Sequence, residues 1–273
     1  MIDLQNKTAV ITGAASGIGL GLARACISRD MSVALSDVDE AKLEATVTSL
    51  ANAGANVIGV PCDVRSADAV EALRDSALSA FRAVHLVCNN AGVGFNRPML
   101  ETKSADWDLV LDINVRGVVN GVDAFLPLFL DQGEGHISAT SSLSGLVADP
   151  GLSLYNASKF AVAGIMEALG LELLEQGSPV STSLLCPGPV VTALATTSAA
   201  VTGSTWGEKV SDYLARGMAP DDVGELAIAQ IAEGRFWLLP HPELTFDLID
   251  GRIAALKDGG QLFEPEVAWT DQA

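Results

Sequence analysis

Short apolar runs rich in β-branched residues alternate with longer amphipathic segments along most of the chain. The runs predict seven strands, at residues 8–11, 32–35, 56–60, 86–88, 136–140, 181–186 and 236–239. The segments between them predict helices at about 17–29, 40–53, 66–81, 104–130, 154–176 and 221–233. Strands that are apolar throughout and separated by helices indicate a parallel sheet covered on both faces. We therefore expect a single-domain α/β fold with a doubly wound parallel sheet of about seven strands.

Two regions depart from this alternation. Residues 190–219 are rich in Ala, Thr, Ser and Val and are too long for an ordinary connection, so we expect a lid, with a disordered surface loop as the alternative. After a body at 1–240, Phe246, Ile249, Ile253 and Leu256 recur at helical spacing. They predict a helical extension at 241–273 that packs either on the body or on another subunit.

Composition supports a globular protein and excludes two kinds of partner. Of the 273 residues, 49% are hydrophobic and 18% are charged, which is enough apolar material for a large core. The 34 acidic and 16 basic residues give a net charge of −18, which argues against nucleic acid and against anionic membrane surfaces. Residues 220–273 hold eleven acidic residues but only three basic ones, so much of the excess is expected away from the proposed pocket.

Two observations favour a cytoplasmic protein without a membrane segment. The start of the chain, Met1 to Lys7, lacks the basic and apolar pattern of a secretory signal. The apolar stretch from Val118 to Leu130 is broken by Asn120, Asp123 and Pro127, so it falls short of a bilayer span.

The cysteines and histidines do not form a pattern typical of a metal site. The cysteines stand in or beside apolar segments without C-x-x-C pairing, and we interpret them as core thiols. The histidines form no cluster in the sequence, and we expect them to be structural. These residues are Cys26, Cys62, Cys88, Cys186, His85, His136 and His241.

A glycine-rich turn follows the first predicted strand. Its sequence is Thr12-Gly13-Ala14-Ala15-Ser16-Gly17-Ile18-Gly19. Glycines between a strand and a helix let the backbone turn tightly and approach a pyrophosphate at the helix N-terminus. Glycine-rich turns also occur for packing reasons, but Asp37 ends the second strand about 20 residues later, as expected for a carboxylate that binds ribose hydroxyls in a Rossmann-type fold. Its alternative role is that of a solvated turn residue.

The neighbourhood of Asp37 also predicts the type of dinucleotide. Its carboxylate would repel a 2′-phosphate, and Ser16 and Val38 supply no cation to hold one. We therefore expect NAD rather than NADP.

Tyr155 and Lys159 lie four residues apart in a predicted helix and therefore share one face. A nearby ammonium, together with a positive nicotinamide ring, favours tyrosinate and so makes tyrosine a base near neutral pH. In isolation such a pair is usually an exposed helix face. Ser142 stands 13 residues before Tyr155, at the carboxyl end of a predicted strand, and makes the pair informative.

These motifs resemble those of the short-chain dehydrogenase/reductase family over about residues 3–240. The resemblance rests on the order and spacing of six features: Thr12-Gly-x-x-x-Gly-x-Gly19, Asn89-Asn-Ala-Gly92, Asn114, Ser142, Tyr155-x-x-x-Lys159 and Pro187-Gly188. It implies that Tyr155 is the acid/base, that Lys159 lowers the pKa of Tyr155 and holds the nicotinamide ribose, and that Ser142 positions the substrate oxygen. It also implies that Asn114 holds a water that relays protons from Lys159.

The resemblance implies further cofactor contacts and an oligomer. Asp63 and Val64 should contact the adenine, and Asn89, Asn90, Ala91 and Gly92 should line the central cleft. Pro187 and Gly188 belong to the shared pattern, and Val190 and Thr192 should fix the carboxamide end. Family members are commonly homotetramers or homodimers built through two long helices, here 104–130 and 154–176.

The loops after the strands predict an apolar substrate pocket. Its expected walls are Val93, Phe95, Leu143, Leu152, Leu194, Trp206 and Tyr213. In the lid, Lys209 and Arg216 are offset by Glu208 and Asp212, so recognition of a carboxylate or phosphate is not expected. The sequence favours an NAD-dependent enzyme that acts on a hydrophobic secondary alcohol or ketone. The alternatives are a dihydrodiol or steroid dehydrogenase and a non-catalytic dinucleotide-binding protein.

Overall fold

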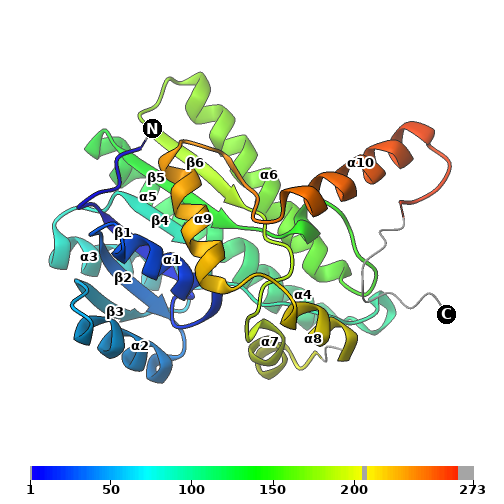
Figure 1. Cartoon of the computed structure of the whole chain (residues 1–273), viewed down its shortest axis with the longest axis horizontal. Helices are drawn as coiled ribbons and strands as arrows, with labels where there is room; N and C mark the ends of the chain where they lie inside the picture. Colours follow the sequence, from blue (N-terminus) through cyan, green and yellow to red (C-terminus); the bar gives the residue numbers. More distant parts are fainter. Residues whose placement is uncertain (1, 205–207, 264–273) are drawn as a thin grey trace.

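The computed structural model describes residues 2–204 and 208–263 and contains the predicted parallel sheet (Figure 1). Seven strands lie in the order β3-β2-β1-β4-β5-β6-β7. They are β1 (Thr8–Thr12), β2 (Ser32–Asp37), β3 (Val57–Pro61), β4 (Leu86–Asn89), β5 (Gly135–Thr140), β6 (Val180–Leu185) and β7 (Trp237–Leu238). The predicted number and places of the strands are confirmed, with boundaries shifted by one or two residues. The doubly wound, single-domain α/β fold is therefore confirmed.

Helices cover both faces of the sheet and form two hydrophobic cores. They are α1 (Gly17–Ile27), α2 (Glu40–Asn52), α3 (Ala67–Phe81), α4 (Ser104–Leu111), α5 (Gly117–Gln132), α6 (Ser153–Glu175) and α9 (Pro220–Ala232). The core under α1, α2 and α9 includes Leu22, Leu43 and Ile228. The core under α3, α5 and α6 includes Phe125 and Met166. Burial of this apolar surface on both faces is the main driving force for the fold.

The predicted helix at 104–130 is a continuous helical segment, Ser104–Gln132. Within it, Asp112–Arg116 forms a short π-helical segment between α4 and α5. Within the described residues, this segment is long and apolar enough to cross a bilayer by length and composition, contrary to the sequence expectation. Here Phe125 and Phe129 are buried in the core beneath α5, so the segment is a core helix of the domain.

The chain reverses its winding direction between β1 and β4. β1 pairs with β2 on one side and with β4 on the other, so the carboxyl ends of β1 and β4 lie side by side. Such a switch point is where doubly wound sheets open a crevice for ligands. Close packing of α1 supports this edge, because a Cβ on Gly21 would lie 2.1 Å from the Pro220 carbonyl oxygen of α9.

The described residues of the segment 190–219 form a helical excursion rather than a featureless loop. It contains α7 (Leu194–Thr202) and α8 (Glu208–Ala215), which lie beside the main body in Figure 1. Its two ends are joined, because Val191 N donates to Met218 O (3.0 Å) and Met218 N donates to Pro189 O (3.0 Å). α7 is tied to the loop after β4, where Gly94 N donates to Ser198 Oγ (2.7 Å). The excursion therefore has a fixed base next to the sheet edge.

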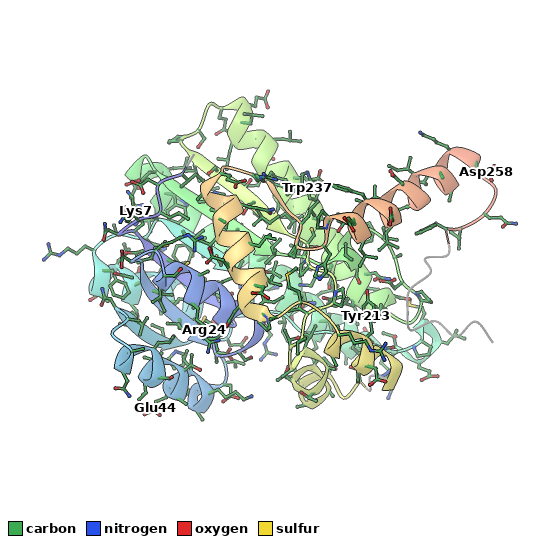
Figure 2. All side chains as sticks on the ribbon, viewed as in Figure 1. Lys7, Arg24, Glu44, Tyr213, Trp237 and Asp258 are labelled. Carbon is green, nitrogen blue, oxygen red and sulfur yellow. The ribbon has the colours of Figure 1, made fainter. Side chains whose placement is uncertain are left out.

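The C-terminal region forms helix α10 (Pro242–Asp258), whose far end, marked by Asp258, extends away from the sheet (Figures 1 and 2). Leu248 packs with Leu143 and Val147, together with partly buried Ile249. Arg252 donates to Leu146 O (2.7 Å) and stacks on the Phe160 ring (5.0 Å). Of the residues that predicted this helix, Phe246, Ile253 and Leu256 lie exposed.

Candidate active site

A cavity of about 920 Å³ opens at the carboxyl ends of β1, β2, β4, β5 and β6. The glycine-rich turn forms one wall. Gly13 and Gly17 have φ values of +64° and +55°, which L side chains rarely adopt, and a Cβ on Gly19 would lie 2.1 Å from Gly13 O. The turn therefore brings backbone and the α1 N-terminus to the cavity, an arrangement that fits a pyrophosphate. Of this turn, the cavity is lined by Gly13, Ser16, Gly17 and Ile18.

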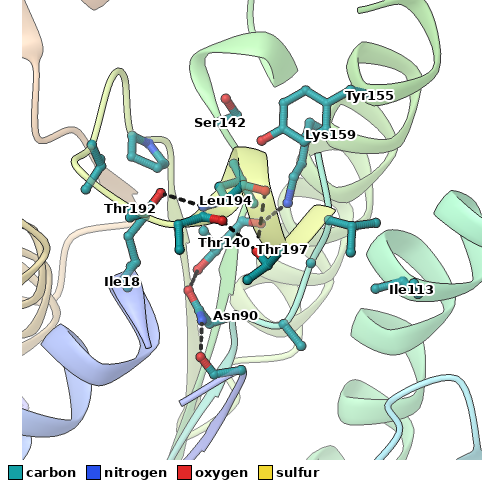
Figure 3. A pocket seen from close by; sticks show the side chains of 18 of the residues that line it. Ile18, Asn90, Ile113, Thr140, Ser142, Tyr155, Lys159, Thr192, Leu194 and Thr197 are labelled. Carbon is teal, nitrogen blue, oxygen red and sulfur yellow. Dashed lines mark hydrogen bonds between the residues drawn. The ribbon is translucent and has the colours of Figure 1, made fainter. Parts of the chain in front are cut away.

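Asn90 joins three strand ends at the centre of the cavity. Asn90 Nδ2 donates to Thr12 O (3.0 Å), and Asn90 Oδ1 accepts from Thr140 Oγ1 (3.1 Å). Thr12 Oγ1 in turn accepts from Asn90 N and Ala91 N, both at 3.0 Å. These hydrogen bonds hold together the ends of β1, β4 and β5 at the crevice (Figure 3). The sequence analysis did not predict the hydrogen bonds made by the Thr12 and Thr140 hydroxyls.

Asn90, Ala91 and Gly92 line the cavity, whereas Asn89 does not. The expectation for Asn89 is wrong because its side chain lies buried beneath α5. A Cβ on Gly121 would lie within 1.9 Å of Asn89 Oδ1, so this glycine leaves the space that the amide fills. Asn89 therefore packs between the end of β4 and α5 and does not face the cavity.

Asp37 occupies the end of the cavity where an adenosine would lie. Its carboxylate accepts from Ala15 N (3.1 Å) and Asp39 N (3.0 Å), which fixes its orientation at the end of β2. The sequence analysis missed two cations at this end, Lys42 and Arg65. Both are paired with carboxylates, Lys42 with Asp39 (2.9 Å) and Arg65 with Asp63 (2.6 Å).

Asp63 and Val64 line the same end of the cavity, and their contact with an adenine stays a prediction. Arg65 holds the pKa of the Asp63 carboxyl below its usual value through side-chain hydrogen bonds. Asn120 Nδ2 donates to Val64 O (2.8 Å), which anchors this segment to α5. The pair therefore forms a rigid wall with a charged rim.

The opposite end is formed by the segment after β6. Pro187, Gly188, Val190 and Thr192 line it, and the contact of Val190 and Thr192 with a carboxamide stays a prediction. Gly188 N donates to His241 Nδ1 (3.1 Å), and burial lowers the pKa of His241. His241 thus fixes the backbone of this segment, which accords with a structural role. Together, the two ends and the glycine turn fit a dinucleotide laid across the strand ends.

Tyr155 and Lys159 lie one turn apart on α6 and are both buried, with 8% and 5% of their surface exposed. Lys159 Nζ donates to Thr140 O (2.9 Å) and lies 5.7 Å from the centroid of the Tyr155 ring. Ser142 faces Tyr155 from the end of β5, and Figure 3 shows the three side chains together. The structure therefore brings the three predicted residues Ser142, Tyr155 and Lys159 together in the cavity.

Burial dominates the titration of this group. It raises the pKa of the Tyr155 phenol to about 12, although a hydrogen bond with Ser142 acts in the opposite direction and Asp149 adds to the increase. It lowers the pKa of the Lys159 ammonium to about 8. In the protein without a dinucleotide the pKa of Tyr155 is thus raised, because desolvation of the phenolate outweighs other effects. The lowering of this pKa by Lys159 together with a nicotinamide ring stays a prediction.

Asn114 lies in the π-helical segment between α4 and α5 and is 1% exposed. Its Oδ1 accepts from Val93 N (2.8 Å), and its Nδ2 donates to Val93 O (2.9 Å) and Ser158 Oγ (3.0 Å). The side chain therefore couples the loop after β4 to α6 next to Lys159. Short π-helical segments inside α-helices are frequent at functional sites. The water relay implied for Asn114 stays a prediction.

The substrate end of the cavity is mostly apolar. Five of the predicted wall residues line it: Val93, Leu143, Leu152, Leu194 and Tyr213. Phe95 does not, because it is fully buried behind Tyr155 with Val110 and Leu154. Trp206 lies outside the described residues. The sequence analysis missed Asp149 and, from α10, Leu248, because a turn and a distant helix gave no signal of their place.

The fold and site together define a dinucleotide-binding α/β protein with a buried tyrosine and lysine at the strand ends. The model of the short chain dehydrogenase family matches residues 7–202. The chain belongs to this family of oxidoreductases.

Relatives and solved structures agree with this assignment. The oxidoreductase SadH of Mycobacterium tuberculosis is 38% identical over 238 residues, which covers 86% of each chain. The 1-deoxy-11-beta-hydroxypentalenate dehydrogenase of Streptomyces exfoliatus is 32% identical over 252 residues, covering 91% of this chain and 88% of the relative. A short chain dehydrogenase/reductase of Burkholderia phymatum in complex with NAD has 38% identity and a TM-score of 0.92, covering 98% and 100%.

Proposed function

We propose that the chain is a cytoplasmic, NAD-dependent oxidoreductase that interconverts a hydrophobic secondary alcohol and its ketone. The observation that carries this proposal is the burial of Tyr155 and Lys159 on one face of α6, opposite Ser142, at the end of a cavity that fits a dinucleotide. A reacting oxygen placed here would meet two hydroxyl groups at once. The arrangement suits proton transfer to or from that oxygen.

Asp37 supports NAD as the cofactor. Its fixed carboxylate lies where the adenosine ribose is expected, and a 2′-phosphate there would be repelled. Lys42 and Arg65, which could offset that repulsion, are already paired with Asp39 and Asp63. The Burkholderia relative in complex with NAD adds support.

Tyr155 is proposed to exchange a proton with the substrate oxygen. When bound, oxidised nicotinamide supplies the hydride acceptor and a positive charge that favours tyrosinate. In the protein itself the pKa of Tyr155 is about 12, so its phenol is protonated at neutral pH and is ready to donate to a ketone oxygen. Ser142 Oγ also donates to that oxygen and orients it, since charge develops there as the carbonyl is reduced.

Lys159 is proposed to assist from behind the phenol. Its ammonium donates to Thr140 O and lines the cavity, and it retains N–H groups that can donate to a ligand there. These groups suit the hydroxyls of a ribose. With a pKa of about 8, Lys159 is mostly protonated at neutral pH, and its charge stabilises a tyrosinate in the low-dielectric interior.

The cavity wall supports an apolar substrate. Within the described part of the chain, the basic residues that line the cavity are Lys42, Arg65 and Lys159, which lie at the adenosine end or in the catalytic group. A carboxylate or phosphate substrate would thus lack the cation it normally needs. The Streptomyces relative is named as a dehydrogenase of an 11-beta-hydroxy compound, which supports an alcohol substrate; because that compound is also a carboxylate, the relative supports the reaction and not the exclusion of acids.

We also propose a homo-oligomer built through α5 and α6. Leu130, Leu171 and Leu174 on these helices are 44%, 65% and 77% exposed. Exposed apolar side chains on two long helices suit a contact between copies of the chain.

A screen of secondary alcohols with NAD and NADP tests the cofactor and the reaction together. We expect NADH formation with apolar alcohols and little NADPH formation. Asp37→Ala should weaken NAD binding more than NADP binding, whereas Asp131→Asn, an exposed control on α5, should leave both unchanged. A wild-type preference for NADP, or tight NAD binding without turnover of any alcohol, would contradict the proposal.

A further inference from the structure

A carboxylate stands in the mostly apolar substrate end of the cavity. Asp149 follows the turn after β5 and lines the cavity together with Leu143, Leu152 and Tyr213. Its side chain is mostly buried, which raises the pKa of the carboxyl. Within the described residues, Asp149 forms no ion pair with a Lys, Arg or His side chain. A desolvated carboxylate without a cation is costly unless donors satisfy it.

The backbone of Asp149 is fixed relative to Tyr155. Asn156, the residue after Tyr155, donates through Nδ2 to Asp149 O (2.9 Å), and Leu152 N donates to the same oxygen (3.4 Å). The first turn of α6 therefore holds the backbone of Asp149 close to Tyr155.

Ser144 links this carboxylate to the reacting group, because Ser144 Oγ donates to Asp149 Oδ2 (3.1 Å) and Ser144 N donates to Ser142 Oγ (3.1 Å). In keeping with this proximity, Asp149 raises the pKa of both Tyr155 and Tyr213.

Among the described residues, one protein group donates to the side chain of Asp149. Ser144 Oγ donates to Asp149 Oδ2 (3.1 Å). A carboxylate has about four acceptor positions, so the bond from Ser144 leaves capacity on a side chain that lines the cavity. A ligand group that donates hydrogen bonds would fill it.

We propose that Asp149 selects substrates that carry a hydrogen-bond donor, a second hydroxyl or an amine, next to the reacting carbinol. This inference rests on the proposed function and narrows its substrate class. The reacting oxygen lies between Ser142 and Tyr155, and the donor on the neighbouring carbon reaches Asp149. A site that holds a buried acceptor rejects an analogue without the donor, because the acceptor then loses its hydration without compensation.

Three compounds of similar shape test this selection. They are 1-phenylethane-1,2-diol, 2-amino-1-phenylethanol and 1-phenylpropan-1-ol, in which a methyl group replaces the donor. For the wild type with NAD we expect kcat/KM for the diol and the amino alcohol to exceed that for the methyl compound by about tenfold or more.

Two substitutions separate charge from hydrogen bonding. Asp149→Asn keeps an acceptor for Ser144 and for a hydroxyl, so the preference for the diol should persist while that for the amino alcohol falls. Asp149→Leu removes the acceptor, so both preferences should be lost and turnover of the methyl compound should rise relative to the diol. Asp131→Asn removes an exposed charge on α5 and should leave all three values unchanged.

Calorimetric binding of the same compounds to the protein with NADH gives a second measurement that does not need turnover. Equal values for the three compounds in the wild type, or equal ratios in the wild type and in Asp149→Leu, would overturn the role of Asp149. Donor-dependent binding without turnover of any alcohol would leave the selection standing and contradict the proposed function instead. An unchanged affinity of Asp149→Leu for NAD shows that the variant is folded.

Discussion

At the scale of single residues, the site depends on how burial changes titratable groups. Tyr155, Lys159 and Asp149 share one desolvated region, and in each of them the pKa moves toward the value that favours the neutral form. Desolvation therefore works against the ionised states that catalysis uses. Charges that arrive with ligands have a larger effect here than in water, because the interior screens them weakly.

The lowered pKa of Lys159 predicts a pH dependence of stability. An unfolded lysine titrates near 10.5 and Lys159 near 8, so between these values the unfolded chain binds more protons and stability from this residue rises with pH. Lys159→Met removes this contribution. The difference in the free energy of unfolding between wild type and Lys159→Met, measured with urea at pH 8 and pH 10, should change in favour of the wild type at pH 10.

The comparison with Lys159→Met cancels groups that Lys159 does not influence. Burial raises the pKa of Cys26 to about 12, which lowers the stability of both proteins equally as the pH rises. Cys186 is the exception, because the charge of Lys159 lowers its pKa, so Cys186→Ala is placed in both proteins before they are compared. A difference that stays constant from pH 8 to pH 10 would contradict the buried, depressed state of Lys159.

At the scale of elements, glycines set how closely helices approach. Gly21 faces Pro220 across α1 and α9, where an added methyl group would meet backbone at 2.1 Å. Gly21→Ala should therefore destabilise the protein, by about 1–3 kcal/mol as for other overpacked cores. Thermal or urea unfolding measures the loss.

Gly164 in α6 is the matched control. A Cβ at this exposed position meets nothing within 4 Å in the described structure. Gly164→Ala should stabilise the protein by about 0.5–1 kcal/mol, since alanine has the higher helix propensity. Equal effects of the two substitutions would contradict the close contact between α1 and α9.

The sequence predicted elements better than it predicted their contacts. Strand positions follow from apolar runs, and the turn after β1 follows from its glycines, so both were confirmed. The place of Phe95 behind Tyr155 and of Asn89 beneath α5 depends on packing between distant segments, which periodicity does not contain. The same holds for Asp149, whose turn reaches the cavity only because α6 fixes it.

At the scale of the whole molecule, the C-terminal helix is part of the site. The sequence placed the acidic end of the chain away from the pocket, but Leu248 of α10 lines the cavity. The acidic residues of the C-terminal region therefore lie on or near a helix that contributes to the substrate end of the cavity. The sequence could not predict this placement, because it depends on how α10 packs on the body, through the contacts of Arg252 with Leu146 O and the Phe160 ring.

The exposed leucines of α6 predict how copies of the chain associate. Leu171→Glu combined with Leu174→Glu places charge in the proposed interface and should convert an oligomer to smaller species in sedimentation velocity experiments. Phe246→Glu on α10 is the comparison, since that side chain is also exposed but lies on another helix. A wild-type monomer, or an oligomer that persists with both glutamates, would contradict the interface.

The central claim is that Tyr155 exchanges the proton with the substrate. The most direct measurement is NADH formation by Tyr155→Phe with an alcohol that the wild type oxidises, alongside the affinity of both proteins for NAD. We predict a loss of kcat of about 100-fold or more, as expected when a general acid/base is removed, with NAD affinity unchanged within about twofold. Turnover by Tyr155→Phe at the wild-type rate would contradict the account.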